Sequence, residues 1–374
     1  MNSKIIESLH GLSDILSATE EQLEQALNLL LEEITEPDAR AAAGMQSRLD
    51  AKIKPVRSLG VLEDIAVQIA GIMGTDRPVI RDRAVLLMAG DHGVVAEGVS
   101  AAPQEITAQM FYSYLSGGGG INVLASHGKA RVIPTDVGMV PPLDPPHLME
   151  RRVKDGTDNM AKGPAMSRTD ALKALFTGAL VAAEAAESGI NLLATGEVGI
   201  GNTTPSAALI SVFTGHSVEE VTGRGTGLKD DALLHKQEVI RSAIELNQPD
   251  PSDPLDTLSK VGGLEIAALA GMILEASCRR IPVILDGIIS MAGALTAARL
   301  CPSCAHYLIT SHSSEEKGHE IGLRSLGLKP RLDLNMRLGE GTGAALMFPL
   351  VDAALKVADE MATFESAGVT TGDF

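Results

Sequence analysis

Aromatic side chains are scarce in this chain of 374 residues, which has no Trp, three Tyr and six Phe. A pocket for a flat ring must therefore be lined mostly by Met, Leu, Ala and Gly. Only three cysteines occur, too few for a fold that depends on a framework of disulfides. Cys301 and Cys304 form a C-x-x-C pair, which is found in redox sites and zinc sites; the absence of a second pair favours two ordinary thiols.

Long apolar runs and an excess of positive charge are also lacking. No run of about 18 apolar residues occurs, so the sequence predicts no membrane span. Glu7 and Asp14 lie where a signal peptide would be apolar, and we expect a cytoplasmic protein. The 31 basic residues face 48 acidic ones, for a net charge of −17. This charge argues against binding to nucleic acid, which depends on neutralising phosphates, and against an anionic membrane surface.

The pattern of apolar residues predicts helices first and then an α/β fold. Residues 1–75 read as helices, and Thr19-Glu-Glu-Gln22 fits a capping box at the start of one of them. From residue 84, short apolar runs alternate with turns and helix-like stretches, which is typical of buried parallel strands. The predicted strands are 84–89, 130–134, 190–194, 282–285 and 305–309, with a sixth candidate at 331–334. A final helix is expected from Gly341 or Thr342 to Met361.

Each predicted strand is followed by a short polar or glycine-rich cluster. These clusters are 90–93, Asp136, 196–197, 286–287, 311–314 and 339–341. In an open parallel sheet, ligands bind beyond the carboxyl ends of the strands. The sequence therefore predicts one ligand site at that edge of the sheet.

Two glycine-rich loops are candidates for binding a phosphate. The stretch 196–204 leads into a probable helix that Thr203 or Thr204 can cap, with Pro205 in its first turn. Free N–H groups at a helix start attract anions, although the glycines also fit a tight turn that serves only the fold. The second loop is 223–228, followed by Lys236, which is either a cation for the phosphate or part of a solvated helix face.

Two further clusters allow more than one interpretation. The stretch 311–319 holds His312 and His319, but their spacing matches no standard pair of metal ligands. Capping of the next helix by Ser313 or Ser314 is the favoured interpretation. Asp91 and His92 could form an acid–base pair or make separate structural hydrogen bonds.

Glu340 lies between two glycines where the last predicted helix begins. The helix dipole favours its charged form, whereas burial beside an apolar ring would raise its pKa. A carboxylate balanced in this way can accept a proton near neutral pH. The alternative is an ordinary acidic residue in the first turn of a helix.

Together these segments resemble the nicotinate-nucleotide–dimethylbenzimidazole phosphoribosyltransferase family. The matching stretches lie in order between residues 84 and 350, and such a series is more specific than any single glycine loop. They are Gly90–Ser100, Pro103–Met110, Ser116–Asn122, Gly196–Thr204, Gly223–Gly227, Leu285–Gly287, Ser311–His319 and Arg337–Gly343.

The resemblance implies a doubly wound, mostly parallel, Rossmann-like sheet. It adds a small helical domain from the chain ends, 1–75 plus about 341–374, to a catalytic domain of residues 76–340. It implies transfer of the phosphoribosyl group of nicotinate mononucleotide to 5,6-dimethylbenzimidazole or a related base, with inversion at the anomeric carbon. The products are nicotinate and α-ribazole phosphate, used in cobamide biosynthesis. Neither metal nor cofactor is expected, and the implied assembly is a homodimer or a heterodimer with a homologue.

Residue roles also follow from the resemblance. Glu340 matches the general base and Glu197 a second acidic residue of the site. The base-side residues are Ser100, Gln104, Gln109 and Leu338. The residues expected to hold the nucleotide and its phosphate are Gly199, Gly201, Asn202, Gly225, Lys236, Asp286, Gly287, Ser313 and Ser314.

One position departs from the family pattern. Ala102 stands between Ala101 and Pro103, where we expect an aromatic residue. The smaller side chain could reshape the base pocket, so a purine, another benzimidazole or a phenol is an alternative acceptor. Three other functions remain open: a partner subunit with weak activity alone, a nucleosidase that hydrolyses the same bond, and a ligand-binding protein without turnover.

Overall fold

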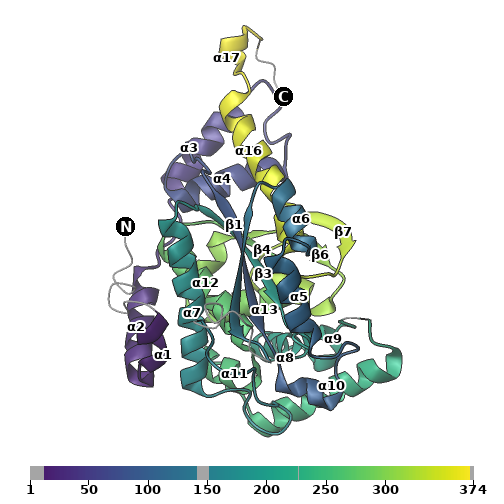
Figure 1. Cartoon of the computed structure of the whole chain (residues 1–374). Helices are drawn as coiled ribbons and strands as arrows, with labels where there is room; N and C mark the ends of the chain where they lie inside the picture. Colours follow the sequence, from purple (N-terminus) through teal and green to yellow (C-terminus); the bar gives the residue numbers. More distant parts are fainter. Residues whose placement is uncertain (1–11, 141–150, 226, 371–374) are drawn as a thin grey trace.

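A five-stranded, all-parallel sheet forms the centre of the computed structural model, which describes residues 12–140, 151–225 and 227–370 (Figure 1). The strand order is β2-β1-β3-β4-β5. The strands are β1 (Arg83–Gly90), β2 (Arg131–Gly138), β3 (Leu192–Val198), β4 (Val283–Leu285) and β5 (Leu308–Thr310). The predicted α/β fold with a parallel sheet is thus confirmed.

The strands form where the sequence is apolar on both faces. All eight residues of β1 are buried, and its six apolar side chains point alternately into two cores. Ala84, Leu86 and Met88 belong to one core, whereas Val85, Leu87 and Ala89 belong to the other. This alternation is the two-residue period of a strand, and burial on both sides explains the nearly continuous apolar run.

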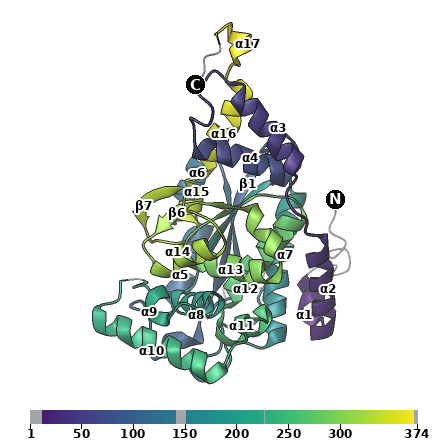
Figure 2. The ribbon, with the colours of Figure 1, turned by 180° about the vertical axis from the view of Figure 1, so that it is seen from behind.

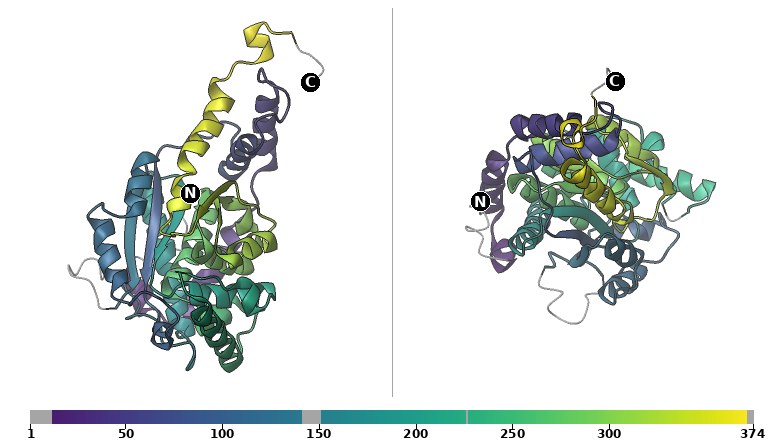
Figure 3. Two further views of the ribbon diagram at one scale, coloured as in Figure 1. Left: turned by 90° about the vertical axis from the view of Figure 1, so that its right-hand side faces the viewer. Right: turned by 90° about the horizontal axis from the view of Figure 1, so that it is seen from above.

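Helices cover both faces of the sheet, as a doubly wound fold requires. In the left-hand view of Figure 3, the blue helices of residues 106–127 lie on one side of the strands and the green helices on the other. The first core includes α7 (Arg168–Glu187), α8 (Thr203–Thr214), α11 (Pro254–Val261), α12 (Leu264–Cys278) and α13 (Ile288–Leu300). The second includes α3 (Ala39–Asp50), α4 (Val61–Met73), α5 (Ile106–Leu115), α6 (Gly120–His127), α15 (Thr342–Ala345) and α16 (Phe348–Glu360).

The end of the chain differs from the prediction in two respects. The single helix expected over 341–361 is two helices, α15 and α16, because Pro349 has no N–H to continue the ladder from α15. The candidate strand at 331–334 is β7 (Leu332–Met336), which pairs with β6 (His312–Ser314) in a separate two-stranded sheet (Figure 2). The remaining elements are η1 (Gly93–Glu97), α9 (Val218–Val221), α10 (Asp230–Asn247), η3 (Pro302–Tyr307), α14 (Lys317–Ser325) and α17 (Phe364–Ala367).

The helices from the two chain ends do not form one group. α3, α4 and α16 pack together at one end of the molecule, whereas α1 (Leu12–Ser17) and α2 (Glu20–Glu33) lie against α7. Thr19 caps α2 with the capping box that the sequence predicts. The proposed division into domains of residues 1–75 plus 341–374 and 76–340 stays a prediction.

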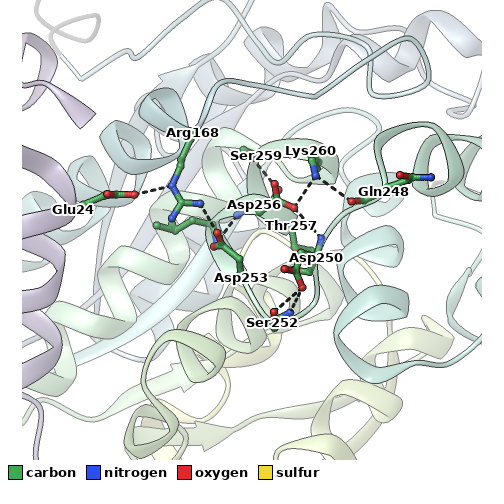
Figure 4. A network of polar contacts seen from close by, with 11 residues as sticks. Glu24, Arg168, Gln248, Asp250, Ser252, Asp253, Asp256, Thr257, Ser259 and Lys260 are labelled. Carbon is green, nitrogen blue, oxygen red and sulfur yellow. Dashed lines mark hydrogen bonds and ion pairs between the residues drawn. The ribbon is translucent and has the colours of Figure 1, made fainter. Parts of the chain in front are cut away.

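Arg168 links α2 to the α/β core. Its guanidinium pairs with Glu24 of α2 and with Asp253 at the start of α11, at 2.8 Å in each case (Figure 4). All three side chains are partly exposed, so each pair contributes at most about 1 kcal/mol. The apolar residues of α2, such as Leu23 and Leu30, therefore account for most of its attachment.

α7 and α12 approach each other through glycines. A methyl group at Gly178 of α7 would lie 1.8 Å from the carbonyl oxygen of Ala268, and one at Gly271 of α12 would lie 1.8 Å from that of Leu175. Backbone atoms cannot move aside as flexible side chains do, so any larger residue must push the two helices apart.

We expect Gly178→Ala to lower the free energy of unfolding by about 3 kcal/mol through this overpacking. Gly163→Ala is the matched control, because nothing lies within 4 Å of a methyl group added there. Urea denaturation of both variants and the parent protein measures the difference. Equal stability of the two variants would contradict the packing described here.

Candidate active site

A cavity of about 350 Å³ opens beyond the carboxyl ends of the central strands. It is lined by residues that follow β3, β4 and β5 and by the turn that precedes α15. Eleven of the predicted site residues line it: Ser100, Glu197, Gly199, Gly201, Asn202, Gly225, Lys236, Gly287, Ser314, Leu338 and Glu340. The structure thus brings together segments that are up to 240 residues apart, at the edge of the sheet where the sequence predicts a site.

Glu340 is held in an unusual backbone conformation. Its φ is 64°, and the flanking Gly339 and Gly341 have φ values of 84° and 88°. The left-handed region is costly for a residue with a side chain, so the surroundings must impose it. The glycines permit the turn to lie close to β3: a methyl group at Gly339 would meet the Glu197 carboxylate at 2.6 Å, and one at Gly341 would meet the Thr195 carbonyl at 2.8 Å.

Three carboxyl groups crowd this wall of the cavity. The backbone N–H of Glu340 donates to Oε1 of Glu197 at 3.3 Å, and Asn202 donates to Oε2 of Glu197. Burial, with the nearby charges of Asp286 and Glu265, raises the pKa of Glu197 to about 8. Burial also raises the pKa of Asp286 and of Glu340 above their ordinary values. Protons therefore bind here more tightly than at exposed carboxylates.

The Glu340 carboxylate receives two hydrogen bonds from the opposite wall. The backbone N–H of Ile121 donates to Oε2 at 3.2 Å, and the hydroxyl of Tyr114 donates to the same carboxyl group. Both donors oppose the effect of burial on the pKa of Glu340. The ring of Tyr114 lies directly on Gly119, where a methyl group would be 2.3 Å away, so the glycine run after α5 provides room for the ring.

The far end of the cavity carries a buried lysine. Lys236 lies in the second turn of α10, is 1% exposed, and donates to Oγ1 of Thr203 at 2.6 Å. It is therefore not part of a solvated helix face. Burial lowers the pKa of Lys236 to about 8, although the negative charge of Glu316 acts to raise it. The Gly225 loop lies beside it: a methyl group at Gly225 would be 3.5 Å from Nζ.

The predicted helix caps near this end are wrong. Thr203 and Thr204 lie inside α8, and Asn202 occupies the N-cap position. Ser313 and Ser314 belong to β6, and α14 begins only after Glu316. Asn202 and Ser314 nevertheless line the cavity, whereas Ser313 lies outside its lining.

Two predicted base-side residues lie outside the lining of the cavity. Gln109 is exposed on α5, and Met110 lines the cavity in its place, because neighbouring residues of a helix point about 100° apart. Gln104 precedes α5 and is also absent from the lining. The half-buried Ala102 lies close to Ser100, since its N–H donates to the Ser100 hydroxyl at 3.2 Å.

Asp91 and His92 make separate structural hydrogen bonds. Asp91 accepts from the hydroxyl of Thr107 and the N–H of Val140, at 2.7 Å each. His92 pairs with the buried Glu265 at 2.9 Å. Of the two interpretations of this dipeptide, the structural one therefore fits, and Asp91 anchors α5 beneath the cavity.

Asp286 is buried behind the cavity. Its two carboxyl oxygens accept the backbone N–H groups of Gly341 and Ala344, at 3.0 Å each. His312 lies 3.9 Å away and stacks on His319, with ring centroids 5.9 Å apart. Burial lowers the pKa of His319 to about 4, so its ring is neutral at physiological pH.

Across residues 12–140, 151–225 and 227–370, no three His, Cys, Asp or Glu side chains are arranged to hold a metal ion. Within the same residues, no helix has the length and apolar character needed to cross a membrane. Cys301 and Cys304 carry free thiols near the start of η3 and do not line the cavity.

Sequence reasoning missed several residues near the site, among them Tyr114, Glu316 and Thr107. Tyr114 and Glu316 line the cavity, and the hydroxyl of Thr107 accepts the N–H of Ile200, which also lines it. Tyr114 stands three residues before a run of four glycines, which is a signal for close approach to a large ring. Thr107 and Glu316 carry no such signal, because their partners come from distant parts of the chain.

Comparisons with known proteins agree with this arrangement. A family model described as Phosphoribosyltransferase matches residues 34–369. The nicotinate-nucleotide–dimethylbenzimidazole phosphoribosyltransferase of Desulforamulus reducens is 52% identical over 344 residues, which cover 91% of this chain and 98% of that protein. This chain belongs to that family. The enzyme of the same name from Geobacter sulfurreducens is 51% identical over 345 residues, which cover 92% of this chain and 98% of the relative.

A solved structure of the family has the same fold. The crystal structure of CobT from Thermus thermophilus superposes with a TM-score of 0.85 and shares 44% of its sequence. The match covers 89% of this chain and all of that one. The five-stranded parallel sheet and the cavity at its edge thus belong to a phosphoribosyltransferase of this family.

We expect Thr107→Val to destabilise the protein by about 2 kcal/mol. Its hydroxyl donates to Oδ1 of Asp91 and accepts the N–H of Ile200 at 2.9 Å, so removing it takes this partner from a buried carboxyl oxygen and a part-buried N–H. Thr107→Ser keeps the hydroxyl and serves as the matched control. Chemical denaturation measures both, and a valine variant as stable as the serine variant would disprove the role of this hydroxyl.

Proposed function

We propose that this protein transfers the phosphoribosyl group of nicotinate mononucleotide to an aromatic base, 5,6-dimethylbenzimidazole or a related ring. The products are nicotinate and an α-riboside 5′-phosphate, the α-ribazole phosphate used in cobamide biosynthesis. The relatives at about 50% identity carry the name of this reaction. The observation that supports it best is that Lys236 and Glu340, a cation and a proton-accepting carboxylate, line one cavity.

The Lys236 end of the cavity is suited to the phosphate. Lys236, the N–H of Gly225 and the start of α8 all supply positive charge or donors there. Ser314 adds a hydroxyl from β6, and Gly287 leaves space for the sugar beside it. A nucleotide bound this way would extend its ribose toward Glu197 and Glu340.

Glu197 and Asn202 would lie beside the reacting carbon. As the bond to nicotinate breaks, its electron pair moves to the nicotinate nitrogen and the ribosyl carbon becomes cation-like. Nicotinate leaves readily because its ring nitrogen is positively charged in the nucleotide. A carboxylate held by Asn202 would stabilise positive charge at that carbon.

Glu340 would serve the incoming base. One ring nitrogen attacks the ribosyl carbon while the proton on the other nitrogen moves to the Glu340 carboxylate. Tyr114 and Ile121 hold that carboxylate in place, and its raised pKa makes it a better proton acceptor than an exposed glutamate. Met110 and Leu338 supply the apolar surface for the ring in a protein that has few aromatic residues.

The acceptor base and the assembly belong to this proposal as well. The half-buried Ala102, beside Ser100, leaves room that an aromatic residue would fill, so a purine or a phenol is the alternative acceptor. We propose a homodimer as the working form. A heterodimer with a homologue, in which this chain alone has weak activity, is the alternative.

The purified protein should release nicotinate from nicotinate mononucleotide only when an acceptor base is present. Dimethylbenzimidazole, adenine, phenol and no acceptor are compared in parallel, and the products are identified by mass. A ribosylated base establishes the transfer and names the preferred acceptor. Release without an acceptor would instead indicate a nucleosidase, and no release at all would favour the partner subunit.

Two substitutions should separate chemistry from binding. We expect Glu340→Gln to lower kcat by roughly 100- to 10,000-fold, with little change in affinity for nicotinate mononucleotide. We expect Lys236→Ala mainly to weaken nucleotide binding, by about 2 kcal/mol, because it removes a cation from a buried anion site. Steady-state kinetics and calorimetry measure the two effects.

Lys229→Ala is the control for the lysine, because Lys229 is exposed at the start of α10 and lies outside the lining of the cavity. An unchanged rate in Glu340→Gln with dimethylbenzimidazole would show that another group takes the proton.

A further inference from the structure

Glu316 places a negative charge in the end of the cavity that suits an anion. It lines the cavity, its side chain is 7% exposed, and it lies between β6 and α14. Its Oε1 accepts the backbone N–H of Gly225 at 2.8 Å, and its charge attracts the Lys236 ammonium. Its Oε2 is buried and has no hydrogen-bond partner among the residues that the structure describes.

The Gly225 N–H, which this carboxylate occupies, and the Lys236 ammonium, which its charge attracts, are groups that a phosphate would need. The Gly225 N–H and Lys236 are the backbone donor and the cation assigned above to the nucleotide phosphate. A carboxylate and a phosphate carry the same sign of charge, so both cannot use these groups at close range without repulsion. An anion that enters must therefore displace the Glu316 carboxylate from Gly225.

We infer that the Glu316 carboxylate takes the place of the substrate phosphate while the site is empty, an inference that rests on the proposed function. In the free protein its carboxylate occupies the Gly225 N–H and its charge acts on Lys236, and nucleotide binding releases it. Its backbone stays fixed during this exchange, because its own N–H donates to the Ser314 hydroxyl at 3.3 Å. The side chain alone has to turn.

The consequence is selectivity among anions. Displacing Glu316 weakens every phosphate ligand, but a nucleotide also gains contacts along the rest of the cavity, whereas inorganic phosphate gains none. Glu316 thus keeps small free anions out of the site. The carboxylate also lies against Gly223, where a methyl group would be 1.8 Å from Oε2.

The test is calorimetry of Glu316→Gln with three ligands: nicotinate mononucleotide, nicotinate riboside and inorganic phosphate. The amide keeps the size and an acceptor oxygen but not the charge. We expect roughly tenfold tighter binding of the mononucleotide and of inorganic phosphate. Binding of the riboside, which has no phosphate, should stay unchanged.

Glu320→Gln is the matched control, because it removes the same charge from an exposed position on α14. It should leave all three affinities unchanged. Glu316→Ala is a second variant and should also bind the mononucleotide more tightly than the parent protein.

Equal or weaker binding of the mononucleotide and phosphate by both Glu316 variants would overturn the inference and make Glu316 a support for bound phosphate. Failure of the parent protein to bind the mononucleotide would contradict the proposed function instead. Inorganic phosphate would then still test the role of Glu316, since its tighter binding to the variant needs no nucleotide.

Discussion

The hydrogen bonds that Asp286 accepts from Gly341 and Ala344 are the constraint on which the site depends. Asp286 follows β4, in the middle of the chain's second half, and its partners lie 55 and 58 residues later. These bonds fix the start of α15 against the carboxyl end of the sheet. The left-handed turn at Glu340 immediately precedes that attachment, since Glu340 adjoins Gly341.

The same attachment gives the cavity its unusual electrostatics. Asp286, Glu197 and Glu340 are buried within one small region, and each carries a pKa above its ordinary value. With a pKa of about 8, Glu197 holds a proton through most of the neutral range in the free protein. A positively charged nicotinate ring beside it would favour the ionised form, so the substrate itself would prepare the carboxylate that stabilises the reacting carbon.

Much of the fold could be predicted because local patterns and burial agree. The five central strands lie within a few residues of the apolar runs, and the clusters that follow them meet as parallel topology requires. β5 begins later than expected because Pro302 starts a 3₁₀ turn through residues that read as strand. The break between α15 and α16 comes from Pro349, a local signal that the prediction of one helix left out.

The candidate site could be predicted where a glycine or a charged residue stands next to a strand end, as for Glu197, Glu340 and Gly199. It could not be predicted where the rotation of a helix about its axis decides which side chain faces the cavity. Met110 faces the cavity and Gln109 does not. The rotation of α5 that produces this is set by the hydrogen bond from Thr107 to Asp91. The contact between Glu316 and Gly225 was equally hidden, because the two residues are 91 positions apart in the sequence.

The central claim is that burial raises the pKa of Glu197 and of Glu340. The direct test is a ¹³C NMR titration of the glutamate carboxyl groups in the labelled protein, with Glu197→Gln and Glu340→Gln used to assign the two signals. The account predicts that the Glu197 signal titrates near pH 8 and the Glu340 signal above 4.5. Titration of both signals at or below 4.5 would contradict it.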